Sequence, residues 1–163
     1  MSGSTDADDP LVRKWQQITV ISPYSRELGL QLHAARPDWC VIRAPYDART
    51  IGNPETGVVH GGVITALLDS CYGLAIFVRM ANLRPMATLD LRIDYLKPAT
   101  PGRDILGGAF CYKLGHELAF VRGAAYHDSL DDPIATSSAI FMFTGGPVIS
   151  LGDPLPALGA TKR

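Results

Sequence analysis

The chain has 163 residues, of which 47% are hydrophobic and 19% charged, and its 15 lysines and arginines nearly balance 16 aspartates and glutamates. This length fits one domain with a sizeable core, and the scattered, balanced charges exclude the basic footprint of a nucleic-acid-binding protein. Residues 1–10 are small, polar and acidic, without the basic and apolar segments of a signal peptide, so we expect a cytoplasmic protein.

The first predicted element is a short helix that follows a disordered segment over residues 1–9. Asp9 is suited to cap this helix, and Pro10 is suited to its first position, because the missing N–H of proline needs no acceptor there. Leu11, Trp15 and Ile18 then fall on one side, so the helix is expected to be amphipathic.

Two extended runs come next, residues 28–36 and 39–47. Pro37 and Asp38 separate them, and this pattern predicts a hairpin. Residues 48–57 are rich in turn-forming residues and predict a loop.

From Gly61 to about Met80 the chain is apolar nearly all round and free of proline, which predicts one long helix. A helix of this kind is normally enclosed by other structure. Asp69 lies in the middle of the run, and a charge at that depth is costly in lipid. We therefore expect a buried core helix and no membrane span.

Four strands are predicted after the helix. Residues 86–98 alternate strictly, with Leu89, Leu91, Ile93 and Tyr95 on one side and Thr88, Asp90, Arg92 and Asp94 on the other. Residues 103–115, 116–128 and 133–145 follow at hairpin spacing. Residues 146–163 contain proline and glycine without periodicity and predict a loose tail.

Consecutive strands with short connections require an antiparallel sheet, and the long apolar helix must cover its apolar face. The sequence therefore predicts a single α+β domain over residues 10–145, in which one curved sheet wraps a central helix. Such a sheet keeps an uncovered face and open edges, so self-association is expected.

The cysteines give no sign of a disulfide framework or a metal site. Cys40, Cys71 and Cys111 each lie in an apolar stretch, and an odd number without paired spacing is typical of reduced thiols in a core. We therefore expect no metal ion.

The start and middle of the central helix carry the residues that suit chemistry. Gly61 and Gly62 leave the first N–H groups of the helix free of side chains, at the positive end of its dipole, which suits a developing oxyanion. A buried carboxylate such as Asp69 must be paired, neutralised or directed into a cleft, where it can activate water. His60 can donate to a leaving group or hydrogen-bond the loop, and Asn53 can be a turn residue or a carbonyl ligand.

Gly61 and Asp69 are separated by about 12 Å along the helix axis at about 1.5 Å per residue. One copy of the helix cannot easily hold both ends of one scissile bond. Either the two groups are not partners, or a second subunit that runs the other way completes the site.

The combined motif resembles that of the hotdog-fold acyl-CoA thioesterases, in particular the phenylacetate-degradation type. The resemblance covers about residues 25–145. The matching residues are Asn53, "GVVHGG" at 57–62, Asp69, Thr88 and "YLKPA" at 95–99. The family fold is an antiparallel sheet around a helix, and its members form dimers that commonly pair into tetramers.

The resemblance implies an acyl-CoA thioesterase that needs no metal and no cofactor beyond the coenzyme A of its substrate. Gly61 N–H and Asn53 would polarise the thioester carbonyl, and Asp69 of the facing subunit would act as general base or nucleophile. Thr88 would help to orient the water, and His60 would lie near the departing sulfur. The other residues expected to contact the substrate are Gly62, Ser70, Tyr72 and Lys97, although Tyr72 is also a candidate for the core.

Two alternatives stay open. A hotdog dehydratase or hydratase would act on 3-hydroxyacyl or enoyl thioesters, but such enzymes place their histidine and carboxylate differently. A non-catalytic acyl-CoA-binding homologue would use the same cleft without turnover.

Overall fold

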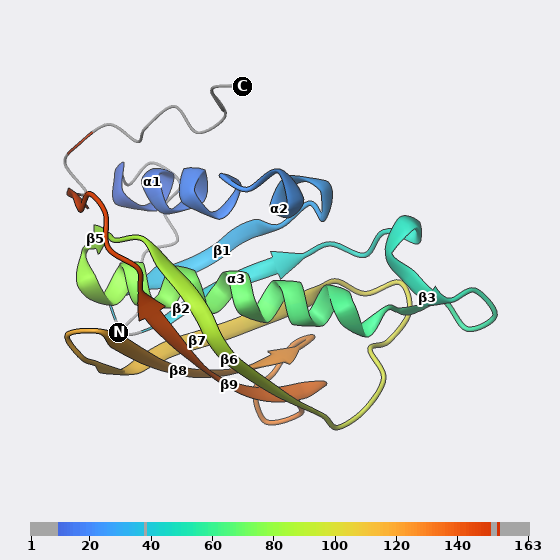
Figure 1. The fold of residues 1–163 in the computed structure, drawn as a ribbon. Coiled ribbons are helices and arrows are strands. Elements are labelled where there is room, and N and C mark those ends of the chain that lie inside the picture. Colours follow the sequence, from blue (N-terminus) through green and yellow to red (C-terminus); the bar gives the residue numbers. More distant parts are fainter. Residues whose placement is uncertain (1–9, 38, 151–152, 154–163) are drawn as a thin grey trace, which may run out of the picture.

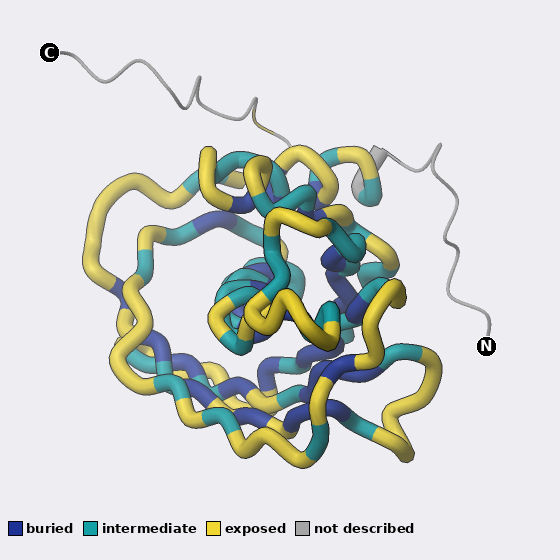
Figure 2. Tube along the Cα trace, turned by 90° about the vertical axis from the view of Figure 1, so that its right-hand side faces the viewer, coloured by how far each residue is buried: buried dark blue, intermediate teal, exposed yellow. Residues whose placement is uncertain are grey.

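A six-stranded antiparallel sheet curves around one long helix in the computed structural model, which describes residues 10–37, 39–150 and 153. The strands lie in the order β1-β2-β7-β8-β9-β6, and the helix, α3, lies along the hollow of the sheet (Figure 1). In the view turned by 90°, α3 lies at the centre with the sheet around it (Figure 2). The predicted α+β architecture is therefore confirmed. The six strands are β1 Gln31–Arg36, β2 Trp39–Ala44, β6 Met86–Tyr95, β7 Ile105–Leu114, β8 Leu118–Tyr126 and β9 Ala135–Phe143.

α3 spans Gly61–Met80, as the sequence predicts, and forms the centre of the core. Leu67, Leu68 and Ile76 on this helix are 0% exposed, since the helix packs against β2, β7 and β8. By length and composition alone α3 could cross a membrane, but 56% of its apolar stretch is buried inside the fold. This burial is typical of the core helix of a globular domain, as expected.

The sheet comes very close to α3 at β7. A Cβ at Gly107 would lie 2.9 Å from Leu67 Cγ, so a larger residue there would push the strand and helix apart. Beside this contact, Cys71 Sγ donates to Gly107 O at 2.9 Å and lies 3.7 Å from Cys40 Sγ. All three cysteines are free and buried, and burial is the main cause that raises the pKa of Cys40. They are free thiols in the core, as predicted.

Two short helices precede the sheet, α1 at Pro10–Thr19 and α2 at Pro23–Glu27. α1 packs on β1 and on α3, and it buries Trp15 and Ile18 there. The predicted amphipathic helix is therefore confirmed. The expectations for Asp9, for the Leu11 side chain and for residues 1–9 fall outside the described residues.

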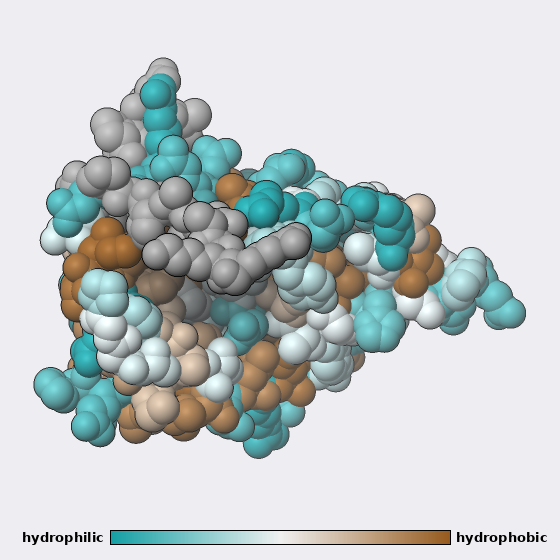
Figure 3. Space-filling view, turned by 45° about the horizontal axis from the view of Figure 1, so that its top comes forward, coloured by the Kyte–Doolittle hydropathy of each residue, from teal (hydrophilic) through white to brown (hydrophobic). Residues whose placement is uncertain are grey.

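The segment predicted as a loop over residues 48–57 is more ordered than a plain loop. It contains a 3-10 turn, Ala48–Thr50, and the strand β3, Ile51–Asn53, which pairs with β4, Val58–Val59. The β3–β4 hairpin projects past the start of α3, and its tip is hydrophilic (Figures 1 and 3).

The segment predicted as a loose tail contains a short strand. β10, Ile149–Ser150, pairs with β5, Asn82–Leu83, just after the end of α3. The tail is therefore attached to the body at this point. Its remaining residues, 151–152 and 154–163, lie outside those described.

β6 departs from the strict alternation that the sequence predicts. The register with β9 shifts between Thr88 and Asp90, and Leu89 is left without a partner as a bulge. Thr88 is paired with Phe141, which faces the core, so Thr88 lies on the inner face, while Leu89 is 54% exposed. The predicted sides of these two residues are wrong, because one extra residue reverses the alternation before it. Leu91 and Ile93 pack on the core as predicted.

Candidate active site

The start of α3 uses most of its free N–H groups internally. His60 is the N-cap: its Nδ1 accepts from Gly62 N–H at 2.9 Å, and its carbonyl accepts from Val63 N–H at 2.9 Å. Gly61 N–H is the first of the helix and has no acceptor within it. Gly61 therefore offers the donor for a ligand at the positive end of the helix dipole, whereas the Gly62 N–H is already engaged.

The capping bond also fixes what His60 can donate. Because Nδ1 accepts a hydrogen bond, a neutral His60 carries its proton on Nε2. The His60 N–H donates to Thr50 O at 2.9 Å, which joins the helix start to the β3–β4 hairpin. His60 is exposed, so its Nε2–H is accessible to a bound molecule.

Tyr95 at the end of β6 holds the first peptide of the helix. Its hydroxyl donates to Gly61 O at 2.8 Å and lies 3.1 Å from Thr65 Oγ1. A Cβ on Gly61 would lie 3.3 Å from the same hydroxyl, so glycine lets the tyrosine approach without displacement. This contact was not predicted as part of the site, although Tyr95 begins the "YLKPA" motif.

Asp69 is paired, and Thr88 is its partner. Thr88 Oγ1 donates to Asp69 Oδ1 at 2.8 Å, and the Asp69 side chain is partly buried between α3 and β6. The bulge at Leu89 makes this contact, because it turns Thr88 inward to the helix. Asp69 is therefore a held carboxylate beside an open edge strand, and not an isolated charge within the core.

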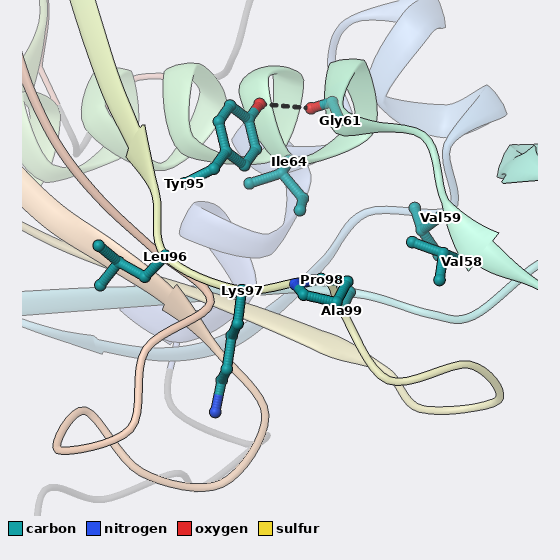
Figure 4. Close-up of a pocket in the computed structure, with 9 residues that line it drawn as sticks. All are labelled: Val58, Val59, Gly61, Ile64, Tyr95, Leu96, Lys97, Pro98 and Ala99. Carbon is teal, nitrogen blue, oxygen red and sulfur yellow. Dashed lines mark hydrogen bonds between the residues drawn. The ribbon is translucent and has the colours of Figure 1, made fainter.

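An apolar pocket of 320 Å³ opens beside Gly61 (Figure 4). β4 and the start of α3 form one side, and the segment that follows β6 forms the other. Lys97 lines this pocket with its chain, but its ammonium extends away from Gly61 and pairs with Asp132. The lining residues are Val58, Val59, Gly61, Ile64, Tyr95, Leu96, Lys97, Pro98 and Ala99.

Asn53 is exposed in the β3–β4 hairpin, where it makes a local turn. Its Oδ1 accepts from Glu55 N–H at 3.0 Å, and its carbonyl accepts from Gly57 N–H at 2.8 Å. This is the usual way in which asparagine shapes a turn. Its part in carbonyl binding stays a prediction.

Tyr72 was expected to contact the substrate, but the structure places its whole side chain in the core. It is 0% exposed, and no hydrogen bond to its hydroxyl is found among the described residues. Burial raises the pKa of Tyr72 to about 12, and the nearby Ser137 only partly opposes this effect. Because α3 is apolar nearly all round, the sequence gives no signal for the direction of this side chain. Ser70, two residues earlier, is partly buried.

Across residues 10–37, 39–150 and 153, no three acidic, histidine or cysteine side chains gather as ligands for a metal ion. The independence from metals that the sequence suggests stays a prediction.

A helix that begins with His-Gly-Gly, carries a paired carboxylate in its middle and lies within a curved antiparallel sheet defines the hotdog thioesterase fold. The family model of the thioesterase superfamily matches residues 56–133. A Halobacterium salinarum protein with an esterase name is 36% identical over 124 residues, which are 70% of this chain and 80% of that protein. The chain belongs to the thioesterase superfamily.

Other relatives agree with this assignment. The medium/long-chain acyl-CoA thioesterase YigI of Escherichia coli is 26% identical over 155 residues, 87% of this chain and 99% of that protein. The crystal structure of a Pseudomonas aeruginosa protein is 40% identical and has a TM-score of 0.74, with 82% of this chain and 98% of that chain covered. A mutant of the phenylacetic acid degradation protein PaaI of Thermus thermophilus, 24% identical with a TM-score of 0.65 over 75% of this chain and 99% of that one, shares the fold.

Proposed function

We propose that the protein hydrolyses acyl-CoA thioesters to a carboxylic acid and coenzyme A. The observation that carries this proposal is that Asp69, held by Thr88, lies on the same helix whose first N–H, on Gly61, is left for a ligand. Asp69 activates a water or attacks the thioester carbonyl directly. Gly61 N–H stabilises the negative charge that develops on the carbonyl oxygen.

The neighbouring residues have supporting roles in this proposal. Thr88 orients the carboxylate through its hydrogen bond, and Tyr95 fixes the Gly61 peptide. His60 Nε2–H donates to the sulfur as it leaves, and Asn53 assists the carbonyl contact. The reaction uses no cofactor beyond the coenzyme A that the substrate brings.

We propose that the working form is a homodimer, because Gly61 and Asp69 lie about 12 Å apart on one helix. β6 is an edge strand of the main sheet, and Leu89, Tyr95 and Leu96 at its bulge and end are each more than half exposed. A second copy that paired with this edge in the antiparallel sense would set Gly61 of one α3 towards the Asp69 of the other. The site would then be completed by both subunits.

A second interface would make the dimer a homotetramer. The outer face of the sheet carries neighbouring aromatic side chains, with the Trp39 and Phe110 ring centroids 5.8 Å apart and the Phe110 and Tyr112 centroids 6.5 Å apart. Tyr112 is 50% exposed. An uncovered aromatic face of this kind supports pairing of two dimers.

The acyl group of the substrate is the finer part of the proposal. YigI acts on medium and long chains by its name, while the sequence motif resembles the phenylacetate-degradation type. We propose a medium-chain or aryl acyl group, because the pocket beside Gly61 is apolar and has a volume of 320 Å³. A screen of short, medium, long and aryl CoA thioesters by release of the free thiol tests this.

The Asp69→Asn variant tests the chemistry, because it keeps the shape of the side chain and removes the carboxylate. We expect kcat to fall by at least about a hundredfold, the usual contribution of a positioned base. The matched control is Glu117→Gln, the same change on an exposed turn between β7 and β8, which should leave kcat unchanged. Full activity of Asp69→Asn would refute the mechanism, and full activity of a strictly monomeric protein would refute the shared site.

A further inference from the structure

Two further depressions adjoin the pocket beside Gly61. Lys97 lines that pocket and also a depression of 120 Å³, which Arg103, His127 and Asp128 line as well. The same Arg103, His127 and Asp128 then line a third depression, of 440 Å³. The pocket at the proposed reacting centre therefore shares Lys97 with a neighbouring depression, and Lys97 and Arg103 bring two cations to this region.

His127 holds the backbone on which Arg103 lies. Thr100 N–H donates to His127 Nε2 at 2.9 Å, so Nδ1 carries the proton and donates to Asp104 O at 2.7 Å. One ring thus joins both ends of residues 100–104 to the end of β8. Arg103 is placed by this brace, and not by a free loop.

Lys97 and Arg103 are paired with acidic residues that are far more exposed than they are. The Arg103 side chain is 44% exposed, and its partner Asp128, at 2.5 Å, is 79% exposed. The Lys97 side chain is 37% exposed, and its partner Asp132 is 79% exposed. Exposed ion pairs contribute little to stability, so the two carboxylates can leave at low cost while the cations stay in the wall.

A phosphate group competes well for such cations. It carries a charge of about −1.5 to −2 near neutral pH and presents three acceptor oxygens. Arginine binds phosphate in a bidentate manner, and lysine binds it as a point charge. A ligand with several phosphates gains from both cations at once, whereas each aspartate engages only one.

We propose that Lys97 and Arg103 form the subsite for the phosphates of the coenzyme A nucleotide, and that Asp132 and Asp128 occupy these cations when no ligand is bound. This subsite rests on the proposed function, because the thioester end of the same molecule would lie beside Gly61. The arm that joins the two ends would pass Lys97, whose chain already lines the pocket and whose ammonium extends away from Gly61 (Figure 4).

The test compares two substrates with the same acyl group, a CoA thioester and a pantetheine thioester that lacks the nucleotide. Lys97→Gln and Arg103→Gln should each raise KM for the CoA thioester by about tenfold, with kcat little changed, because a lost charged contact is of that order. Arg103→Gln should not alter KM for the pantetheine thioester, because Arg103 does not line the pocket beside Gly61. Asp128→Asn and Asp132→Asn should lower KM for the CoA thioester, because they release the cations.

The matched control is Arg36→Gln. Arg36 is exposed at the end of β1, opposite Trp39 in the ladder with β2. Trp39 begins β2, whereas Arg43, which lines the third depression, lies near the other end of that strand. Its loss removes the same charge far from the subsite, so both KM values should stay at the wild-type level. If Arg36→Gln raised KM for the CoA thioester as much as Arg103→Gln does, general electrostatic attraction would replace the subsite.

Binding of coenzyme A itself, measured by calorimetry, separates this proposal from the proposed function. If the wild type hydrolyses no thioester but binds coenzyme A, and Lys97→Gln and Arg103→Gln lose this binding, the proposed enzyme activity is refuted and the subsite is supported. A wild-type protein that hydrolyses CoA thioesters, with KM and coenzyme A affinity unchanged in both variants, would overturn the subsite and leave the enzyme. Inorganic phosphate should compete with coenzyme A in the wild type and not in the double variant.

Discussion

The hydrogen bond from Thr88 to Asp69 offers the sharpest test of the proposed site. Thr88→Val keeps the shape of the side chain and removes only the donor that lies 2.8 Å from Asp69 Oδ1. A hydrogen bond to a charged group contributes about 1.5–3 kcal/mol. Thr88 is exposed, so water replaces part of the bond, and we take about 1.5 kcal/mol. This converts to about a tenfold loss in kcat, if the bond orients the carboxylate in the transition state.

The assay is the steady-state release of free coenzyme A thiol by Thr88→Val, Thr88→Ser and Thr136→Val. Thr88→Ser keeps the hydroxyl and should retain most of the wild-type kcat. Thr136 is an exposed threonine on β9, so its change to valine controls for the substitution itself. Thermal unfolding shows whether each variant is folded. A folded Thr88→Val with kcat within about twofold of the wild type would refute the positioning role.

Three more substitutions have expected effects on stability. Gly52→Ala should lower the free energy of unfolding by about 1–3 kcal/mol, because its Cβ would lie 2.8 Å from His60 Cα, and thermal melts should show this loss. Gly73→Ala should raise it by about 0.5–1 kcal/mol, because the new Cβ meets only Met86 Cε at 3.5 Å inside a helix; a lower melting temperature would contradict this. Tyr72→Phe should be at least as stable as the wild type at neutral pH, since it removes a buried hydroxyl without a partner in the described residues. The pKa of Tyr72 is raised from 10 to about 12 in the fold, so the wild type loses stability as the pH rises from about 10 through 12, and Tyr72→Phe should lose less over that range in urea titrations.

The sequence predicts the parts of the fold that depend on long, regular patterns. The 20-residue segment of α3 has no proline and is apolar nearly all round. This pattern predicts a helix that lies in the core. The strands β7, β8 and β9 are separated by turn-forming residues and follow the predicted order. The short hairpin of β3 and β4 was not predicted, because its strands are too short to show alternation.

Some contacts of the candidate site were not predicted, because they join residues that are far apart in the chain. Asp69 stands out in the sequence because it is a carboxylate within an apolar helix. Gly61 stands out because it lies at the helix start, where it leaves an N–H group accessible. The contact from Tyr95 to Gly61 joins residues 34 apart, and nothing local to either residue marks it. Tyr72 was expected either in the substrate pocket or in the core, because a uniformly apolar helix does not reveal which side faces the core, and the structure places it in the core.

The direction of Thr88 was predicted wrongly for a specific reason. A period of two is the only rule that the sequence offers for a strand, and Thr88 falls with the polar row under this rule. The unpaired Leu89 breaks the period at a point where no glycine or proline marks it. At this point the polarity of a side chain does not predict the side of the sheet that it faces, because the polar Thr88 lies on the inner face and the apolar Leu89 is exposed.

The bulge also divides β6 into two segments, and the orientation of each one is set by a different feature of the structure. Residues after it, such as Leu91 and Ile93, are held to one face by the core, while the segment before it takes its orientation from the single extra residue. Deletion of Leu89 would keep Thr88 opposite Phe141, next to Asp90 in a regular ladder. If Leu89 instead entered the ladder opposite Phe141, Thr88 would turn outward and Leu89 would take the face of Asp69. A change that removes the bulge can therefore exchange the neighbour of the carboxylate, while point substitutions elsewhere in the strand continue to be selected for packing.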